Sequence, residues 1–448
     1  MRDMTQGPII RHMLLFSIPL MLGSMFQQLY GTANSVVVGK VLGKAALASM
    51  GTAIPLMNVM FFLLIGMTMG VSILLAEYFG AREKGLLKDQ LATALLAGLL
   101  FTAALSVAAV AATGPALRAI NAPPEIIPQA AAYLRIIFAG LVLTFLFNLL
   151  AFAMRAVGEA AVPLLLLIAS ALLNTGLALL FVGPLGWGVE GAAWATVISQ
   201  AAATLGCFIY IRLKLPEMYI PLRQIRLKAA LLPKTVSFSL AAGLQQTIIF
   251  IGVFLVQGAV NPLGVDAIAA FNAVSRLDDF VLIPCDSIAM ALMMFISQNR
   301  GAGRNERIRK GIWSAVGVSV VYTAGATLVI FLAIPQLMTI FLDPGESAAI
   351  ALGVKYMKVM CAFYMVSAFC NALQGVFRGL GLIKITLYAT LLQIPVRVAL
   401  AYLLTAWFAM NAIALAIGIG WIFMVSYQVY EYRKRRHHWL SAAALAAV

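Results

Sequence analysis

Four charged residues stand close together in one long apolar stretch, and their chemistry is that of ion coupling. Residues 268–297 contain Arg276, Asp278, Asp279 and Asp286. A charged side chain at the centre of a membrane helix costs about 2.5–3.5 kcal/mol on insertion scales, so such residues usually have a function. A carboxylate with little counter-charge there can take up and release a proton, or bind a cation instead. We therefore predict a cation-coupling site formed by Asp278, Asp279 and Asp286.

Helical geometry places these groups along one helix. At 3.6 residues per turn, Asp279 and Asp286 lie on one face two turns apart, and Arg276 lies one turn before Asp279. The alternative is that Arg276 and Asp279 only neutralise each other and hold the bundle together. Asp286 has no cation close to it in the sequence, and Arg397 on another helix is its candidate partner. Pro284 removes a backbone hydrogen bond and is expected to kink the helix.

Amide side chains in the other apolar stretches are candidates to line a substrate cleft. Most isolated Asn and Gln residues in membrane helices bond neighbouring helices, and this is the alternative for each of them. Two adjacent pairs near the middle of their stretches stand out, as does Pro19, a second expected kink. The candidate cleft residues are Gln27, Gln28, Asn34, Asn148, Asn174, Gln245, Gln246, Asn272, Asn371 and Gln374.

The apolar composition indicates that these residues lie in membrane-spanning helices. Hydrophobic residues make up 63% of the chain and charged residues 10%, whereas soluble domains carry about 25% charge. We therefore predict an all-α polytopic membrane protein in which each span has roughly 20 residues or more. The twelve predicted spans are 12–37, 51–76, 91–113, 131–153, 162–182, 191–212, 233–258, 268–297, 311–333, 353–377, 383–406 and 410–430.

The net charge of +15 reflects topology rather than nucleic-acid binding. Of the 31 Lys and Arg residues, 23 fall on the side of the N-terminus and six on the opposite side. Basic loops stay in the cytoplasm. We therefore expect a protein of the cell membrane with both termini on the cytoplasmic side. The three histidines lie near the chain ends, and no phosphate-binding loop or Cys/His cluster is present. We expect no enzyme activity, no metal and no cofactor, and no disulfides among the four cysteines.

The chain also repeats itself. Residues at offsets of 221 and 223 match, among them Leu42-Gly43 with Leu263-Gly264, Gly80-Ala81 with Gly301-Ala302, Tyr133 with Tyr356, Arg155 with Arg378, and Gly158 with Gly381. Six spans separate the copies, so both have the same orientation. We predict two homologous six-helix lobes, 1–215 and 233–448, joined by a basic cytoplasmic linker at 216–232. Such duplicated bundles are typical of secondary transporters with the site between the halves. Nothing in the sequence calls for an oligomer, and we expect a monomer.

Several motifs resemble the multidrug and toxic compound extrusion (MATE) transporters. They are Ser17-Ile18-Pro19-Leu20, Asn34–Gly39, Asn148 with Arg155 and Gly158, Arg276-Leu277-Asp278 with Pro284, and Gln298–Gly303. The resemblance implies a V-shaped pair of six-helix lobes and alternating access. It also implies export of organic, often cationic, compounds in exchange for H⁺ or Na⁺.

The chain departs from the family pattern at its usual coupling acids. Asn34 stands where the resemblance implies an aspartate, fifteen residues after Pro19, and Ala178 stands where a second one is expected. Amides and alanine carry no proton at neutral pH, so we place coupling on the Asp278 helix instead. The alternatives are a lipid-linked saccharide flippase of the same superfamily, and, from other classes, a channel or a membrane-embedded enzyme.

Overall fold

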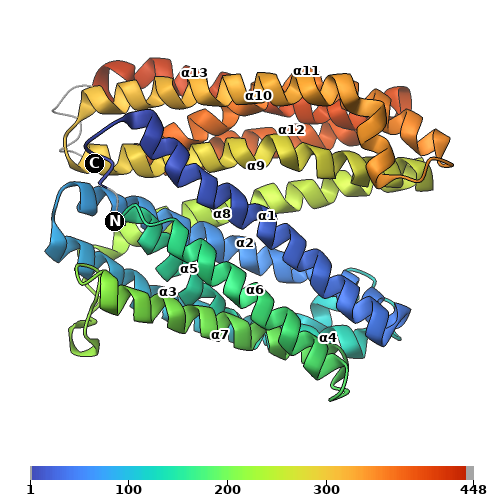
Figure 1. The fold of residues 1–448 in the computed structure, drawn as a ribbon, viewed down its shortest axis with the longest axis horizontal. Coiled ribbons are helices and arrows are strands. Elements are labelled where there is room, and N and C mark those ends of the chain that lie inside the picture. The colour runs from blue at the N-terminus through green and yellow to red at the C-terminus, as the bar shows by residue number, and fades with distance from the viewer. Residues whose placement is uncertain (1–2, 440–448) are drawn as a thin grey trace. The chain divides into compact units, whose positions relative to one another are not determined.

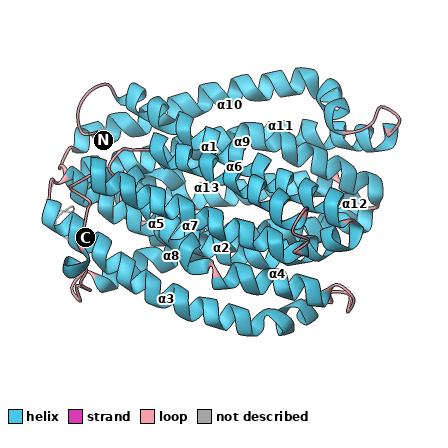
Figure 2. Cartoon of the chain, turned by 60° about the horizontal axis from the view of Figure 1, so that its bottom comes forward, coloured by secondary structure: helices cyan, strands magenta, loops and turns pink. Residues whose placement is uncertain are grey.

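All regular structure in the described part of the chain is helical (Figure 2). The computed structural model describes residues 3–439, and for residues 29–40, 44, 45, 47, 222 and 436–439 it describes the backbone only. The helices of Figure 1 are α1 (Ile9–Leu42), α2 (Lys44–Gly80), α3 (Lys84–Ala119), α4 (Ile127–Ala139), α5 (Leu141–Ala156), α6 (Ala161–Val182), α7 (Gly188–Lys214), α8 (Leu232–Val260), α9 (Val265–Gly301), α10 (Asn305–Phe341), α11 (Ser347–Gly379), α12 (Ile383–Phe408) and α13 (Asn411–Trp439). Two short 3₁₀ turns, Leu222–Gln224 and Asn261–Leu263, precede α8 and α9.

The number of membrane-length helices agrees with the twelve predicted spans. Among the described residues, eleven helices are long and apolar enough to cross a membrane. The pair α4 and α5, bent by 46° at Gly140, is apolar and long enough when taken together, and counted as one span it makes twelve. This confirms the prediction of an all-α polytopic membrane protein. The four cysteines are free and buried, as expected for small packing residues.

The backbone shows the internal repeat at three matched turns. Gly43 and Gly264 have φ values of 81° and 96°, and Gly158 and Gly381 have 82° and 78°. At the third pair Gly303 has φ 67°, and its counterpart 221 residues earlier is Arg82 at φ 61°. Positive φ is a left-handed conformation that glycine adopts at little cost and arginine rarely adopts. Both halves therefore end corresponding helices with the same turn, even where one half lacks the glycine.

Packing divides the chain into two units, which exchange parts of two helices. Of the described residues, unit 1 comprises Asp3 and 19–247, and unit 2 comprises 4–18 and 248–439. The start of α1 therefore packs with the C-terminal helices, and the first half of α8 packs with the N-terminal ones. Pro19, inside α1, stands where that helix passes from one unit to the other.

Close backbone contacts tie the helices within each unit. In unit 1, a side chain on Gly66 of α2 would strike the backbone of Ala242 and Gly243 in α8. In unit 2, a side chain on Gly375 of α11 would strike the carbonyl of Ala289 in α9. Larger side chains at these positions would hold the helices apart, and close packing matters here because lipid supplies no hydrophobic force between membrane helices.

In unit 2, the residues before α1 lie against the turn between α9 and α10. Met4 is 1% exposed, and its backbone N–H donates to Oε1 of Gln298 at 2.9 Å. The Nδ2 of Asn299 donates to the Met4 carbonyl at 3.2 Å. This N-terminal segment is therefore bound to its unit by specific polar contacts.

Two arginines at the start of α10 complete this docking. Arg304 donates to the Thr5 carbonyl at 2.7 Å. Arg307 donates to the carbonyls of Gly7 at 3.0 Å and Met4 at 3.1 Å. Both guanidinium groups thus satisfy backbone acceptors of the segment that leads into α1.

We predict that Arg307→Ala loosens this segment. Hydrogen bonds to charged groups contribute about 1.5–3 kcal/mol, and partial exposure lowers that range here. Backbone amides in residues 4–12 should therefore exchange hydrogen for deuterium roughly tenfold faster, measured by mass spectrometry. Arg433→Ala, which removes an exposed arginine from α13, serves as the control and should leave this exchange unchanged. Equal exchange in Arg307→Ala and the unaltered protein would contradict the prediction.

Candidate ion-coupling site

Asp278 lies in the middle part of α9 and is held by a tyrosine of the neighbouring helix. It is half-buried, and the hydroxyl of Tyr364 in α11 donates to its Oδ1. Tyr364 is fully buried, and its oxygen also lies 3.2 Å from the Sδ of Met357. The Asp278 carboxylate therefore has a fixed orientation inside unit 2.

A cation and a second phenol complete the surroundings of this carboxylate. Arg397 of α12 and Tyr356 of α11 interact electrostatically with Asp278. Among the described residues, the Tyr356 hydroxyl and the Arg397 Nε are buried without a hydrogen-bond partner. Buried polar atoms of this kind are normally satisfied, often by water. Three helices thus place one acid, one cation and two phenols together, with hydrogen-bonding capacity left for a small guest.

Asp286 has a different cation from the one expected. It is exposed on α9 and interacts with Arg378, at the end of α11, and with Asp279. The interpretation of Arg397 as its partner is therefore wrong, since Arg397 acts on Asp278. The reason is the close crossing of α9 and α11 at Gly375, one turn from Arg378, which brings the end of α11 beside Asp286.

The two remaining charged residues of the predicted cluster show the same range of exposure as Asp278 and Asp286. Asp279 is half-buried and Arg276 is exposed. For Asp278 the structure gives both a hydrogen bond and a cation from neighbouring helices.

In unit 1, two of the candidate cleft amides make packing contacts. The Nδ2 of Asn174, which is 1% exposed, donates to Oγ1 of Thr196 at 3.1 Å and joins α6 to α7. The Nδ2 of Asn148 donates at 2.8 Å to the Thr144 carbonyl of its own helix. These contacts agree with the alternative of hydrogen bonding within the bundle, and a cleft role for both stays a prediction.

The other candidates of unit 1 differ in exposure. Gln245 is buried, Gln246 is half-buried, and Gln27 and Gln28 are exposed. Asn34 falls outside the residues whose side chains the structure describes.

In unit 2 the amides show the same range. Gln374 is buried, with its Nε2 3.9 Å from the Sδ of Met424 in α13. Asn371 is half-buried, and Asn272 is exposed near the start of α9. Pro284 is buried within α9.

Sequence reasoning missed Tyr356, Tyr364 and Arg378 as members of these clusters. Tyr356 and Arg378 were visible as repeat residues, matching Tyr133 and Arg155. Tyr364 follows Tyr356 by eight residues, so both lie near one face of α11. Which helix that face meets depends on packing and is not encoded in this spacing.

We predict that Tyr364→Phe slows coupled transport about tenfold, because it removes one charge-assisted hydrogen bond at Asp278. The concentration of coupling ion that gives half-maximal transport should shift as well, which a purely structural role would not produce. Tyr388→Phe removes a hydroxyl from a side chain that is 53% exposed and is the matched control. The measurement is substrate flux in proteoliposomes under a series of ion gradients. An unchanged half-maximal concentration would contradict the assignment.

Comparisons with known proteins agree with this architecture. The family model described as MatE matches residues 19–180 and 241–403, one stretch in each half of the chain. The probable multidrug resistance protein YpnP of Bacillus subtilis is 29% identical over 441 residues, covering 97% of both chains. YoeA of the same organism, also described as a probable multidrug resistance protein, is 28% identical over 435 residues, covering 93% of this chain and 91% of its own.

A solved structure shares the fold. It is described as the outward-facing conformation of a multidrug resistance MATE family transporter of the MOP superfamily. Its TM-score to this chain is 0.88 at 22% sequence identity, covering 99% of this chain and 98% of that one.

Proposed function

This chain belongs to the MatE family of membrane transporters, and we propose that it is a secondary antiporter that exports amphipathic, cationic small molecules. The exchanged ion is H⁺ or Na⁺, and both termini face the cytoplasm. Its relatives are transporters, and this chain is likewise a transporter and not an enzyme. The names of YpnP and YoeA, which refer to multidrug resistance, support the substrate class.

The observation that carries the proposal is the cluster around Asp278. A carboxylate inside a membrane-length helix, next to Tyr364 and Arg397, has two states that differ by one bound cation. Coupling requires a group of this kind, because ion binding must change the energy of one conformation relative to the other. Asp286 with Arg378 is the second such group of unit 2.

Alternating access would link this ion binding to substrate movement. The repeat provides two related halves, which in transporters move against each other around a central site. With the ion bound, Asp278 is neutral and its attraction to Arg397 is lost. With the ion released, the charge pair re-forms. An organic cation would compete with the ion for the same negative charge.

The test is counterflow of ethidium in proteoliposomes with an imposed proton gradient or sodium gradient. We expect uptake against the ethidium gradient under one of the two and none without a gradient. Transport that does not saturate and ignores both gradients would instead indicate a channel. Unimpaired transport in Asp278→Asn, Asp279→Asn and Asp286→Asn alike would remove the coupling helix from the mechanism.

A further inference from the structure

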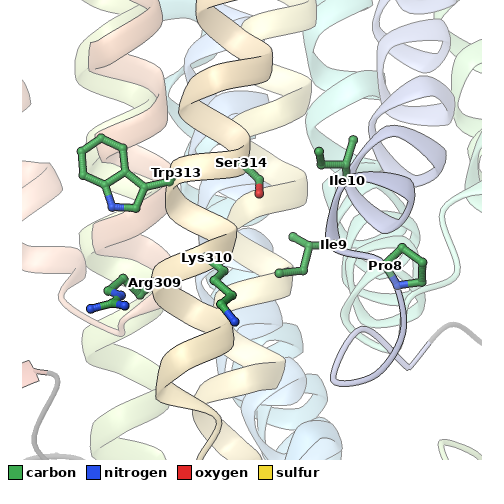
Figure 3. A pocket seen from close by; sticks show the side chains of 7 residues that line it. All are labelled: Pro8, Ile9, Ile10, Arg309, Lys310, Trp313 and Ser314. Atoms are coloured by element: carbon green, nitrogen blue, oxygen red, sulfur yellow. The ribbon is translucent and has the colours of Figure 1, made fainter.

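A pocket of about 660 Å³ opens between the start of α1 and the first turns of α10, both in unit 2. Lys310 and Ser314 lie on the side of α10 toward Ile9 and Ile10, while Arg309 and Trp313 lie on its other side (Figure 3). Pro8 completes the lining. The pocket therefore combines two cations, an indole and aliphatic side chains.

The wall formed by α1 is held in place by the docking described above. Arg307 binds the carbonyl of Gly7, the residue directly before Pro8, at 3.0 Å. The lining residues of α1 therefore follow a segment that is tied to the start of α10. The pocket is a defined feature of the fold, because both of its walls are joined by these bonds.

The internal repeat shows what is unusual here. At the offset of 221, Lys310 and Ser314 correspond to Asp89 and Thr93 of α3. In unit 1, the Nζ of Lys228 lies 3.5 Å from the Asp89 carboxylate, and its backbone N–H donates to Oγ1 of Thr93 at 3.2 Å. A positive group of the chain itself thus covers the acidic position in unit 1. In unit 2, Lys310 stands at the position of Asp89 and lines an open pocket. Because the charge at this position is reversed, a ligand of this pocket should be an anion.

We propose that this pocket binds the headgroup of an anionic phospholipid. Lys310, on the side of α10 toward α1, provides the donor for its phosphate, and Arg309 on the other side of this helix adds positive charge at the rim of the pocket. Trp313 is 68% exposed, as is typical of an indole at the membrane interface, and Ile10 is 49% exposed and faces an acyl chain.

The nearby acid holds these cations only weakly. Glu306 pairs with Lys310 at 2.7 Å, one turn apart on α10, and the two side chains are 72% and 61% exposed. Exposed pairs of this type contribute little and exchange with solvent ions. A lipid phosphate would therefore replace the Glu306 contact at small cost. The proposal does not depend on which ion drives transport.

Native mass spectrometry of the full chain, with palmitoyl-oleoyl phosphatidylglycerol or phosphatidylcholine added in detergent, tests the proposal. We expect preferential binding of one phosphatidylglycerol. The double variant Arg309→Ala/Lys310→Ala should weaken it about 25-fold, since each basic residue near the membrane contributes about fivefold. Lys88→Ala removes the corresponding charge from α3 and is the matched control, with no expected loss. The charge-keeping Arg309→Lys/Lys310→Arg should retain binding.

Three results would overturn the proposal. They are equal retention of phosphatidylglycerol in the double alanine variant, an equal loss in Lys88→Ala, and equal binding of phosphatidylcholine. Glycerol phosphate, which carries the anion without acyl chains, should not displace the lipid at millimolar concentration. Displacement would identify a site for free phosphate and would refute the lipid assignment.

Discussion

Asp278→Asn should reduce gradient-driven transport to the background of protein-free liposomes. The amide keeps the size of the side chain and still accepts the hydrogen bond from Tyr364, but it binds no proton and attracts no cation. Arg397 would then lose its electrostatic attraction to the Asp278 carboxylate of α9. The measurement is ethidium flux in proteoliposomes under the gradient that drives the unaltered protein.

Asp266→Asn is the control for this prediction. Asp266 lies in the first turn of the same helix and is exposed, so its substitution removes an identical charge away from the cluster. It should transport normally. Size-exclusion profiles and thermal stability of both variants should match those of the unaltered protein. Coupled transport by a folded Asp278→Asn would show that another group senses the ion.

The second large effect is structural, at the crossing of α2 and α8 in unit 1. Gly66→Leu should leave little folded protein. A Cβ at this position would lie 2.7 Å from the Cα of Gly243 and 2.8 Å from the carbonyl carbon of Ala242. These are backbone atoms, which cannot rotate away as a flexible side chain does. Overpacking a close-packed interior typically costs about 1–3 kcal/mol, and moving two helices apart should cost at least the upper value.

The expected result is a Tm lowered by about 10 °C or failure to recover a monodisperse protein. Gly51→Leu is the matched control, because Gly51 is exposed on the same helix and has no heavy atom within 4 Å of an added Cβ. This variant should retain the Tm of the unaltered protein. If Gly66→Leu also retained it, the close approach of α2 and α8 would be wrong.

The spans and the repeat could be predicted from the sequence because lipid sets simple requirements. A membrane helix needs a long apolar run, and twelve such runs are readable without knowing what any helix contacts. The matched turns at Gly158 and Gly381 follow from the repeat in the same way, since both require positive φ. Asp278, Asp279 and Asp286 also stand out as candidates in the sequence, because a charged residue in an apolar stretch is conspicuous whatever it packs against; their role in coupling stays a prediction.

The partners of those acids were decided by tertiary structure. The pairing of Asp286 with Arg378 and the place of Tyr364 beside Asp278 depend on how α11 is rotated against α9. That rotation is set by close contacts such as Gly375 on Ala289. Apolar composition looks alike on every face of a membrane helix, so the sequence does not reveal which face meets which neighbour.

The exchange of α1 and α8 between units has the same origin. Hydropathy predicts each helix as one continuous span, and it contains no sign that Met4–Ile18 packs with the C-terminal helices. The sequence by itself therefore determined which segments lie in the membrane, how many there are and that they are duplicated. Only the tertiary structure decided which side chains meet, because shape and close approach select helix contacts in lipid, where hydrophobicity does not distinguish them.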